Sequence, residues 1–169
     1  MVSRKAARWT PTSANRRGQR GQYRTGRSSL IAYLDTSALV KAYVDETGTD
    51  MVLEHLQAAE TAASHEIAYV EARSAYARLA REGRLTQSEL DSVKAEFESD
   101  WTRYARISSD LTLLRRAATL AEAFALRAYD SVHLAAAEYL STGLGKPVMF
   151  LCFDRKLCQA ASVLRMQLA

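Results

Sequence analysis

Residues 30–35 read Leu-Ile-Ala-Tyr-Leu-Asp, a run of five apolar residues that ends in an acid. Residues 148–154 follow the same pattern, because Val-Met-Phe-Leu-Cys-Phe precedes Asp154. Short runs that are apolar throughout are typical of strands buried on both faces of a parallel sheet. The two runs therefore predict two buried strands, each with an aspartate directly beyond its carboxyl end.

Around these runs, short apolar segments alternate with longer helical stretches. Further strands are expected at 61–64 and 105–108, with a short edge strand near 166–168. Helices are expected at 37–43, 50–59, 66–82, 86–103, 111–126, 131–141 and 155–164. The fourth of these helices begins at a capping box formed by Thr86 and Glu89. Strands that alternate with helices predict an α/β fold with a parallel sheet covered by helices on both faces.

The composition is that of an ordinary globular domain. The chain has 169 residues, of which 48% are hydrophobic and 25% are charged, and a chain of this length is expected to form one domain with a real core. No run approaches the roughly 20 apolar residues that a membrane span needs. Cys152 and Cys158 fit neither a disulfide framework nor a zinc-ligand spacing, so a reducing, cytoplasmic location is the simplest interpretation.

The net charge of +4 comes entirely from the amino-terminal segment. Residues 1–29 hold eight of the 23 basic residues and no acid, which leaves 15 basic against 19 acidic residues in 30–169. We expect a disordered basic tail at 1–29, followed by one compact domain at 30–169. The tail is interpreted as a dispensable leader, an RNA-attracting arm or a targeting segment. The basic pI is therefore no argument that the domain itself binds nucleic acid.

Four acids stand at positions where chemistry is expected: Asp35, Glu71, Asp130 and Asp154. Open parallel sheets place their functional crevice beyond the carboxyl ends of their strands, where Asp35 and Asp154 are predicted to lie. If the fold brings the four acids together, their mutual repulsion must be relieved by protonation or by a cation. Mg²⁺ or Mn²⁺ is the natural ligand of such a cluster of carboxylate oxygens.

Each aspartate also has a purely structural interpretation, because an aspartate between a strand and a helix is a good helix N-cap. Glu71 is harder to explain in this way. Its neighbours one helical turn away, Ile67, Ala68, Ser74 and Ala75, are small or apolar, so Glu71 is expected to face inward. A buried carboxylate without a partner costs on the order of several kcal/mol. The alternative is that Glu71 faces solvent between helices.

Neighbouring polar residues are candidates for supporting roles. Ser37 could hold a carboxylate or a bound water, or it could cap the first helix. His133 lies one helical turn after Asp130, which makes it either an acid–base group or a buried structural histidine. Arg155 and Lys156 are candidates for phosphate contact, and the alternative is that they form the solvated start of a helix.

The four acidic segments resemble those of the PIN-domain nucleases, and specifically the VapC-type toxins of toxin–antitoxin pairs. The segments read YLDTSALVKAYVDE (33–46), ASHEIAYVEARSAYAR (63–78), LRAYDSVHLAAA (126–137) and FLCFDRKLCQAA (150–161). The third segment is the most specific match, and the four occur in the family's order. The resemblance covers the chain from about residue 30 to the carboxyl terminus and leaves the basic tail outside.

The resemblance implies a PIN-like three-layer sandwich with a parallel sheet of four to five strands. It also implies cleavage of RNA phosphodiesters that depends on Mg²⁺ or Mn²⁺, homodimerisation and inhibition by a small VapB-like antitoxin. Asp35, Asp130 and Asp154 would be metal ligands, and Glu71 would be a ligand or a base that orients the attacking water. Such a metal lowers the pKa of a bound water and neutralises charge on the phosphate. Whether one or two metals act stays open.

Two other functions compete with this interpretation. A phosphatase of the haloacid dehalogenase type also begins with an aspartate after its first strand. That family requires a second aspartate two residues later, where this chain has Ser37. The second alternative is a non-catalytic RNA- or protein-binding module on a PIN scaffold, and the presence of all four acids argues against it.

Overall fold

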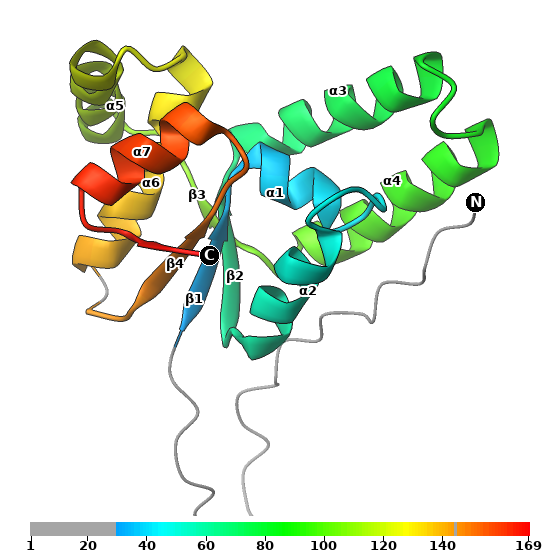
Figure 1. Cartoon of the computed structure of the whole chain (residues 1–169), viewed down its shortest axis with the longest axis horizontal. Coiled ribbons are helices and arrows are strands. Elements are labelled where there is room, and N and C mark those ends of the chain that lie inside the picture. The colour runs from blue at the N-terminus through cyan, green and yellow to red at the C-terminus, as the bar shows by residue number, and fades with distance from the viewer. Residues whose placement is uncertain (1–29, 144) are drawn as a thin grey trace, which may run out of the picture.

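The computed structural model describes residues 30–143 and 145–169, so the predicted basic tail at 1–29 lies outside the described residues. Five parallel strands form one sheet in the order β3-β2-β1-β4-β5 (Figure 1). The strands are β1 (Ile31–Leu34), β2 (Thr61–His65), β3 (Ala105–Ile107), β4 (Val148–Leu151) and β5 (Gln167–Leu168). The predicted α/β fold with a parallel sheet is confirmed, and the predicted edge strand is present as β5.

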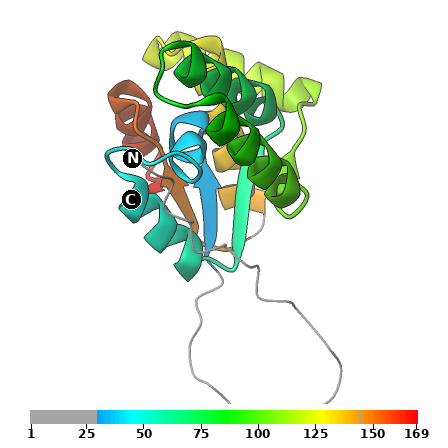
Figure 2. The ribbon, with the colours of Figure 1, turned by 90° about the vertical axis from the view of Figure 1, so that its right-hand side faces the viewer.

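Helices cover both faces of this sheet and make the three-layer sandwich. They are α1 (Thr36–Lys41), α2 (Thr49–Ala58), α3 (Ile67–Arg81), α4 (Gln87–Trp101), α5 (Leu111–Phe124), α6 (Ala128–Gly143) and α7 (Arg155–Val163). Figure 1 shows α1–α4 on one side of the sheet and α5–α7 on the other, and Figure 2 views the side of α3 and α4. Among residues 30–143 and 145–169, no helix is both long and apolar enough to cross a membrane.

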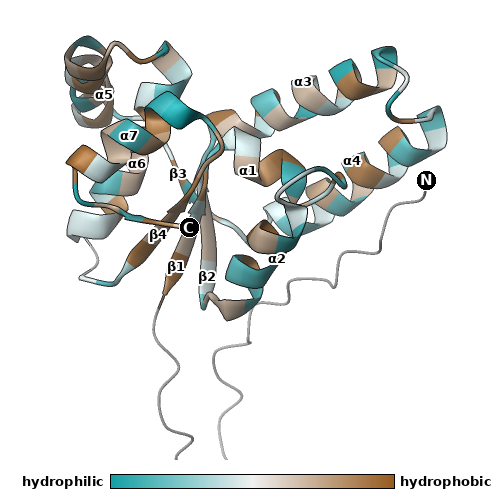
Figure 3. Ribbon diagram, viewed as in Figure 1, coloured by the Kyte–Doolittle hydropathy of each residue, from teal (hydrophilic) through white to brown (hydrophobic). Residues whose placement is uncertain are grey.

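The alternation of side chains along β1 divides the core into two halves. Ala32 and Leu34 are buried in the cluster shared with α1–α4, whereas Ile31 and Tyr33 are buried in the cluster shared with α5–α7. Figure 3 shows β1 and β4 coloured as hydrophobic along their length. Because both faces of β1 are buried, its apolar residues need no polar alternation, which is why the run 30–34 identified it as a buried strand.

Two predicted boundaries are wrong at positions that matter for the acids. β4 ends at Leu151, where its pairing partner β1 ends at Leu34, so Asp154 lies three residues beyond the strand rather than directly after it. The other error concerns α6, which begins at Ala128 rather than Ser131 and places Asp130 inside its first turn. The capping box of Thr86 and Glu89 is confirmed at the start of α4.

The two cysteines are paired in the structure, so the expectation that they fit no disulfide is wrong. Cys152 follows β4 and Cys158 lies in the first half of α7, and a disulfide joins them across a Cα–Cα distance of 6.5 Å. A spacing of six residues brings the sulfurs together because the chain turns from the sheet into a helix between them. The cross-link therefore spans the segment that carries Asp154.

Gly48 is needed at the start of α2 for two reasons. Its φ of +97° lies in the left-handed region, and a Cβ atom there would overlap the ring of Phe153. We predict that Gly48→Ala lowers the free energy of unfolding by about 1–3 kcal/mol, through backbone strain and displacement of the Phe153 ring. Urea unfolding measures this change.

Gly83→Ala is the matched control for this substitution. Gly83 also has a positive φ, +72°, but nothing lies within 4 Å of the position that its Cβ would take. Its replacement therefore reports the backbone strain alone. Equal losses for the two variants would show that contact between Gly48 and Phe153 contributes nothing to stability.

Candidate active site

A pocket of about 400 Å³ opens at the carboxyl edge of the sheet, and all four predicted acids line it. Asp35 follows β1, Glu71 comes from the middle of α3, Asp130 from the first turn of α6, and Asp154 from the start of α7. Segments that are far apart in the sequence thus supply one acidic pocket.

Asp35 is the most deeply buried of the four acids and is held by α1. Its Oδ1 accepts a hydrogen bond from the Ala38 N–H at 2.8 Å, and the Ser37 hydroxyl donates to both of its oxygens at 2.7 and 2.9 Å. Burial raises the pKa of Asp35 to about 6, although its hydrogen bonds and nearby His133 oppose the rise. Ser37 also accepts a hydrogen bond from the Phe153 N–H at 2.8 Å, which ties α1 to the segment after β4.

Asp154 and Asp130 differ in how firmly they are held. Asp154 is the N-cap of α7 and accepts from the Leu157 N–H at 2.8 Å, as the structural interpretation expected. Asp130 is not an N-cap, and within the part of the chain that the structure describes it forms no hydrogen bond or ion pair. Burial, followed by the nearby Asp154 carboxylate, raises the pKa of Asp130. Among the described residues, Asp130 is therefore the one acid of the four whose charge no hydrogen bond balances.

Glu71 faces inward, as its neighbours in the sequence indicated, and its side chain is 24% exposed. Its Oε2 accepts hydrogen bonds from the Thr36 hydroxyl at 2.5 Å and from His133 Nε2 at 3.1 Å. Burial alone would raise the pKa of Glu71, but the hydrogen bonds from His133 and Thr36 outweigh burial and lower it. Glu71 is thus kept ionised in a setting where Asp130 is pushed towards protonation.

His133 is the hub that connects Glu71 to the core, and sequence reasoning missed this role. It is 2% exposed, and the Tyr33 hydroxyl lies 3.0 Å from its Nδ1. Because an ionised carboxylate can only accept, we assign the hydrogen to Nε2, so that in the neutral ring Nδ1 accepts from Tyr33. The structure confirms a buried histidine, but it hydrogen-bonds Glu71 rather than Asp130.

The two basic residues predicted to contact nucleic acid lie outside this pocket lining. The Lys156 ammonium donates to the Ala125 carbonyl at the end of α5, and Arg155 is exposed at the start of α7. Their contact with RNA stays a prediction. Other cations line the acidic pocket: Lys41, Arg78, Arg84 and Arg127.

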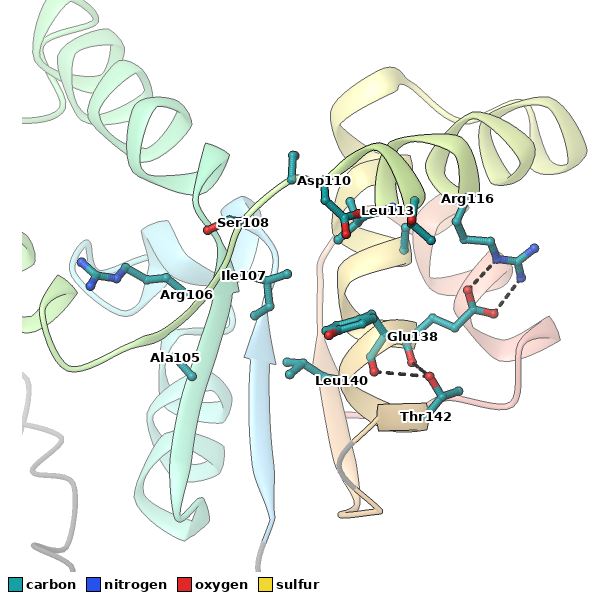
Figure 4. Close-up of a pocket in the computed structure, with 14 residues that line it drawn as sticks. Ala105, Arg106, Ile107, Ser108, Asp110, Leu113, Arg116, Glu138, Leu140 and Thr142 are labelled. Atoms are coloured by element: carbon teal, nitrogen blue, oxygen red, sulfur yellow. Dashed lines mark hydrogen bonds and ion pairs between the residues drawn. The ribbon is translucent and has the colours of Figure 1, made fainter.

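A larger cavity, of about 780 Å³, lies between β3 and the helices α5 and α6 (Figure 4). None of the four acids lines it. Its one lining glutamate, Glu138, is held by Arg116 through two contacts of 2.7 Å, which Figure 4 shows as dashed lines. Ile107, Leu113 and Leu140 supply apolar walls. Its other acid, Asp110, accepts a hydrogen bond from the Leu113 N–H as the N-cap of α5. The larger cavity therefore has two separate acids, each held by a partner, where the smaller pocket gathers four.

The acidic pocket lies in a fold that other proteins share. Residues 32–162 match the PIN domain family. The chain belongs to the PIN-domain family. It is 35% identical over 128 residues to Ribonuclease VapC45 of Mycobacterium tuberculosis (strain CDC 1551 / Oshkosh) and, equally, to Ribonuclease VapC49 of strain ATCC 25618 / H37Rv. Each alignment covers 75% of this chain and 86% of the relative.

Among solved structures, this PIN domain is similar to VapBC2 from Rickettsia felis, which was crystallised bound to a DNA fragment from its promoter. The TM-score is 0.57 and the sequence identity is 13%, with 82% of this chain and 97% of the other chain covered. At this identity the likeness concerns the fold alone. It confirms the three-layer arrangement of the fold.

The donors of this PIN-domain pocket suit a hard divalent cation, although they do not form a closed cage. Within residues 30–143 and 145–169, no three His, Cys, Asp or Glu side chains form a ready-made metal site. Mg²⁺ is usually held by one or two carboxylates together with water and substrate phosphates, so a closed cage is not required. The four carboxylates in one pocket, with Asp130 unpaired, fit that kind of binding.

The raised pKa of Asp35 predicts how stability depends on pH. Between about pH 4 and 6 the unfolded state ionises before the folded state, so metal-free protein loses stability as the pH rises. Asp35→Asn keeps an N-cap and removes this titration. From pH 4 to pH 7, the free energy of unfolding of the variant should rise relative to that of the native protein by a total on the order of 3 kcal/mol. Urea unfolding in EDTA measures this difference.

Asp110→Asn is the control, because it replaces an exposed N-cap aspartate. If the difference in stability between Asp35→Asn and the native protein did not change with pH, the raised pKa of Asp35 would be contradicted.

The hydrogen bond between Tyr33 and His133 predicts a second stability effect. Tyr33→Phe leaves Nδ1 of a buried imidazole without its donor, which should cost about 1–3 kcal/mol in urea unfolding. Tyr76→Phe is the matched control, because the buried Tyr76 hydroxyl has no partner among the described residues. We expect Tyr76→Phe to be neutral or stabilising. Equal effects of the two substitutions would rule out the assigned hydrogen bond.

Proposed function

We propose that this protein is a metal-dependent endoribonuclease that hydrolyses RNA phosphodiester bonds, and that it is the toxin of a type II toxin–antitoxin system. The observation that carries the proposal is the convergence of Asp35, Glu71, Asp130 and Asp154 on one pocket of a PIN domain. The two Mycobacterium tuberculosis relatives, which are 35% identical over most of their length, are named ribonucleases. We further propose that the nuclease domain comprises residues 30–169 and that the protein acts on RNA in the cytoplasm.

In this proposal Asp35, Asp130 and Asp154 would hold the cation. Asp35 is oriented by Ser37 and by the first turn of α1, and Asp154 is oriented by its cap on α7. Asp130, which has no competing hydrogen bond within the described residues, is free to turn towards the ion. When bound, Mg²⁺ or Mn²⁺ supplies a water of lowered pKa and neutralises charge on the phosphate.

Glu71 has a different role from the aspartates. Its Oε2 is occupied by Thr36 and His133, which leaves Oε1 as the oxygen that can accept a hydrogen bond from water. The lowered pKa keeps Glu71 ionised, and this favours an acceptor that orients the attacking water over a group that stores a proton. His133 and Thr36 position this carboxylate.

The proposed partners are a VapB-like antitoxin and a second copy of the chain. The Rickettsia felis structure contains VapBC2, which supports an antitoxin partner. Leu111, Leu114 and Tyr139 are large hydrophobic residues that are exposed on α5 and α6, and they would gain from burial in a homodimer. A non-catalytic PIN module remains the competing function, and the observation that disfavours it is the Asp130 carboxylate, which has no hydrogen bond or ion pair among the described residues.

Asp130→Asn tests the catalytic role without removing a structural contact. We expect cleavage of a labelled single-stranded RNA to fall by about 100-fold or more. The melting temperature should stay equal or rise, because the substitution removes repulsion from Asp154. Glu122→Gln, an exposed charge change on α5, is the control for nonspecific effects. RNA cleavage that survives Asp130→Asn would refute the proposed active site.

The metal dependence is tested by thermal unfolding, which does not require RNA cleavage, and by cleavage in the presence of EDTA. Mg²⁺ or Mn²⁺ should raise the melting temperature of the native protein by mass action, and this rise should shrink in Asp130→Asn. EDTA should abolish cleavage, and added Mn²⁺ should restore it. Cleavage at an unchanged rate in EDTA would contradict the role of the carboxylates as metal ligands.

A further inference from the structure

The acidic pocket has a wall of opposite charge that none of the assignments above uses. Glu46 joins two cations there. Its Oε2 lies 2.9 Å from Lys41 Nζ, and its Oε1 lies 2.7 Å from Arg84 Nη2. Lys41 comes from α1, whereas Arg84 comes from the turn between α3 and α4, and all three side chains line the pocket.

Glu46 keeps these two cations from neutralising the pocket. A lysine free to move beside four carboxylates would pair with them and block the site. Because each Glu46 oxygen takes one cation, Lys41 and Arg84 are held as a pair whose net charge with Glu46 is +1. The hydrogen bonds from both cations lower the pKa of Glu46 against the effect of burial, so the bridge persists in mildly acidic solution.

Phe153 completes this wall with an exposed aromatic ring. Lys41 Nζ lies 4.8 Å from the ring centroid, and the ring edge lies against Gly48, where no Cβ fits. The backbone N–H of Phe153 donates to Ser37, whose hydroxyl donates to Asp35. The ring is thus fixed beside the acidic pocket, yet 37% of the residue is exposed.

Lys41 covers one face of the Phe153 ring, which leaves the rest of its exposed surface for a single unpaired base beside two cations. Arginine and lysine bind phosphate oxygens, and an unpaired base can stack on an aromatic side chain. A duplex would keep its bases stacked inside and could use only the cations. The described chain is acidic around the metal ligands, so a polyanion needs these cations to approach.

Resting on the proposed nuclease function, we propose that Lys41, Arg84 and Phe153 form a subsite for single-stranded RNA beside the acidic pocket. Lys41 and Arg84 bind a backbone phosphate, and Phe153 stacks on an unpaired base. Glu46 is a positioning residue that holds the two cations. The subsite makes the enzyme select unpaired RNA over duplex RNA.

The salt dependence of RNA binding tests the phosphate contacts. The test uses the full chain carrying Asp130→Asn, so that RNA is bound without cleavage. Binding of a labelled single-stranded RNA is measured by fluorescence anisotropy at salt concentrations from about 50 to about 300 mM KCl, where counterion release affects affinity. Adding Lys41→Gln or Arg84→Gln should weaken binding and reduce the slope of log K against log salt by about 0.7.

Arg81→Gln is the matched control, because it removes the same charge from α3 outside the pocket lining. If Lys41→Gln perturbs folding, Arg84→Gln still tests the phosphate contacts, because 53% of the Arg84 side chain is exposed and its replacement should not disturb the fold. If the slope of log K against log salt were the same for Arg84→Gln and Arg81→Gln, the proposed phosphate contacts would be overturned. If cleavage by the native chain still required metal, the nuclease function would stand while the subsite fell.

Phe153→Leu tests the stacking contact, because leucine keeps an apolar side chain and removes the aromatic ring. We expect it to weaken single-stranded RNA binding by about ten-fold without changing the salt slope. Binding of a duplex with the same sequence should not change. Equal affinity of Phe153→Leu and its parent for single-stranded RNA would overturn the role of the ring.

Discussion

The pairing of β1 with β4 is the constraint on which the site depends. Leu34 lies opposite Leu151, and the Asp35 N–H donates to the Leu151 carbonyl at 3.1 Å, so both strands stop at the same level. Parallel strands that end together send their chains out on one edge of the sheet. Asp35 begins α1 there and Asp154 begins α7, with the acidic pocket between them. Moving this register by a single residue would turn the β1 side chains that pack against α1–α4 towards α5–α7, and the reverse, so neither half of the core would fit.

The fold could be predicted from the sequence because its signals are local. The two apolar runs identified β1 and β4, and the capping box identified the start of α4, since each depends on residues close together in the chain. The boundaries of β4 and α6 could not be predicted, because they depend on where a partner strand ends and how a turn enters a helix. The end of β4 is set by its pairing with β1, far away in the sequence, and the start of α6 follows a turn after α5 that no residue pattern marked.

The candidate site also has a part that could be predicted from the sequence and a part that could not. The placement of the acids followed from strand ends and from the apolar neighbours of Glu71. The hydrogen bonds that hold Glu71 and His133 in place could not be predicted, because Tyr33 and His133 are 100 residues apart and Thr36 and Glu71 are 35 residues apart. The one available signal was that Tyr33 and His133 are polar residues within apolar segments, where a buried polar group must find a partner.

The outer strands of the sheet are very short. On one side β5 is paired at only two positions, and on the other side β3 has three residues. A strand edge offers unpaired amide and carbonyl groups, and long flat edges invite the strands of other molecules. Edge strands this short offer few unpaired backbone groups to which a strand of another molecule could bind. The sheet therefore offers little edge for pairing with another molecule, and contacts with other proteins are left to its helical surfaces.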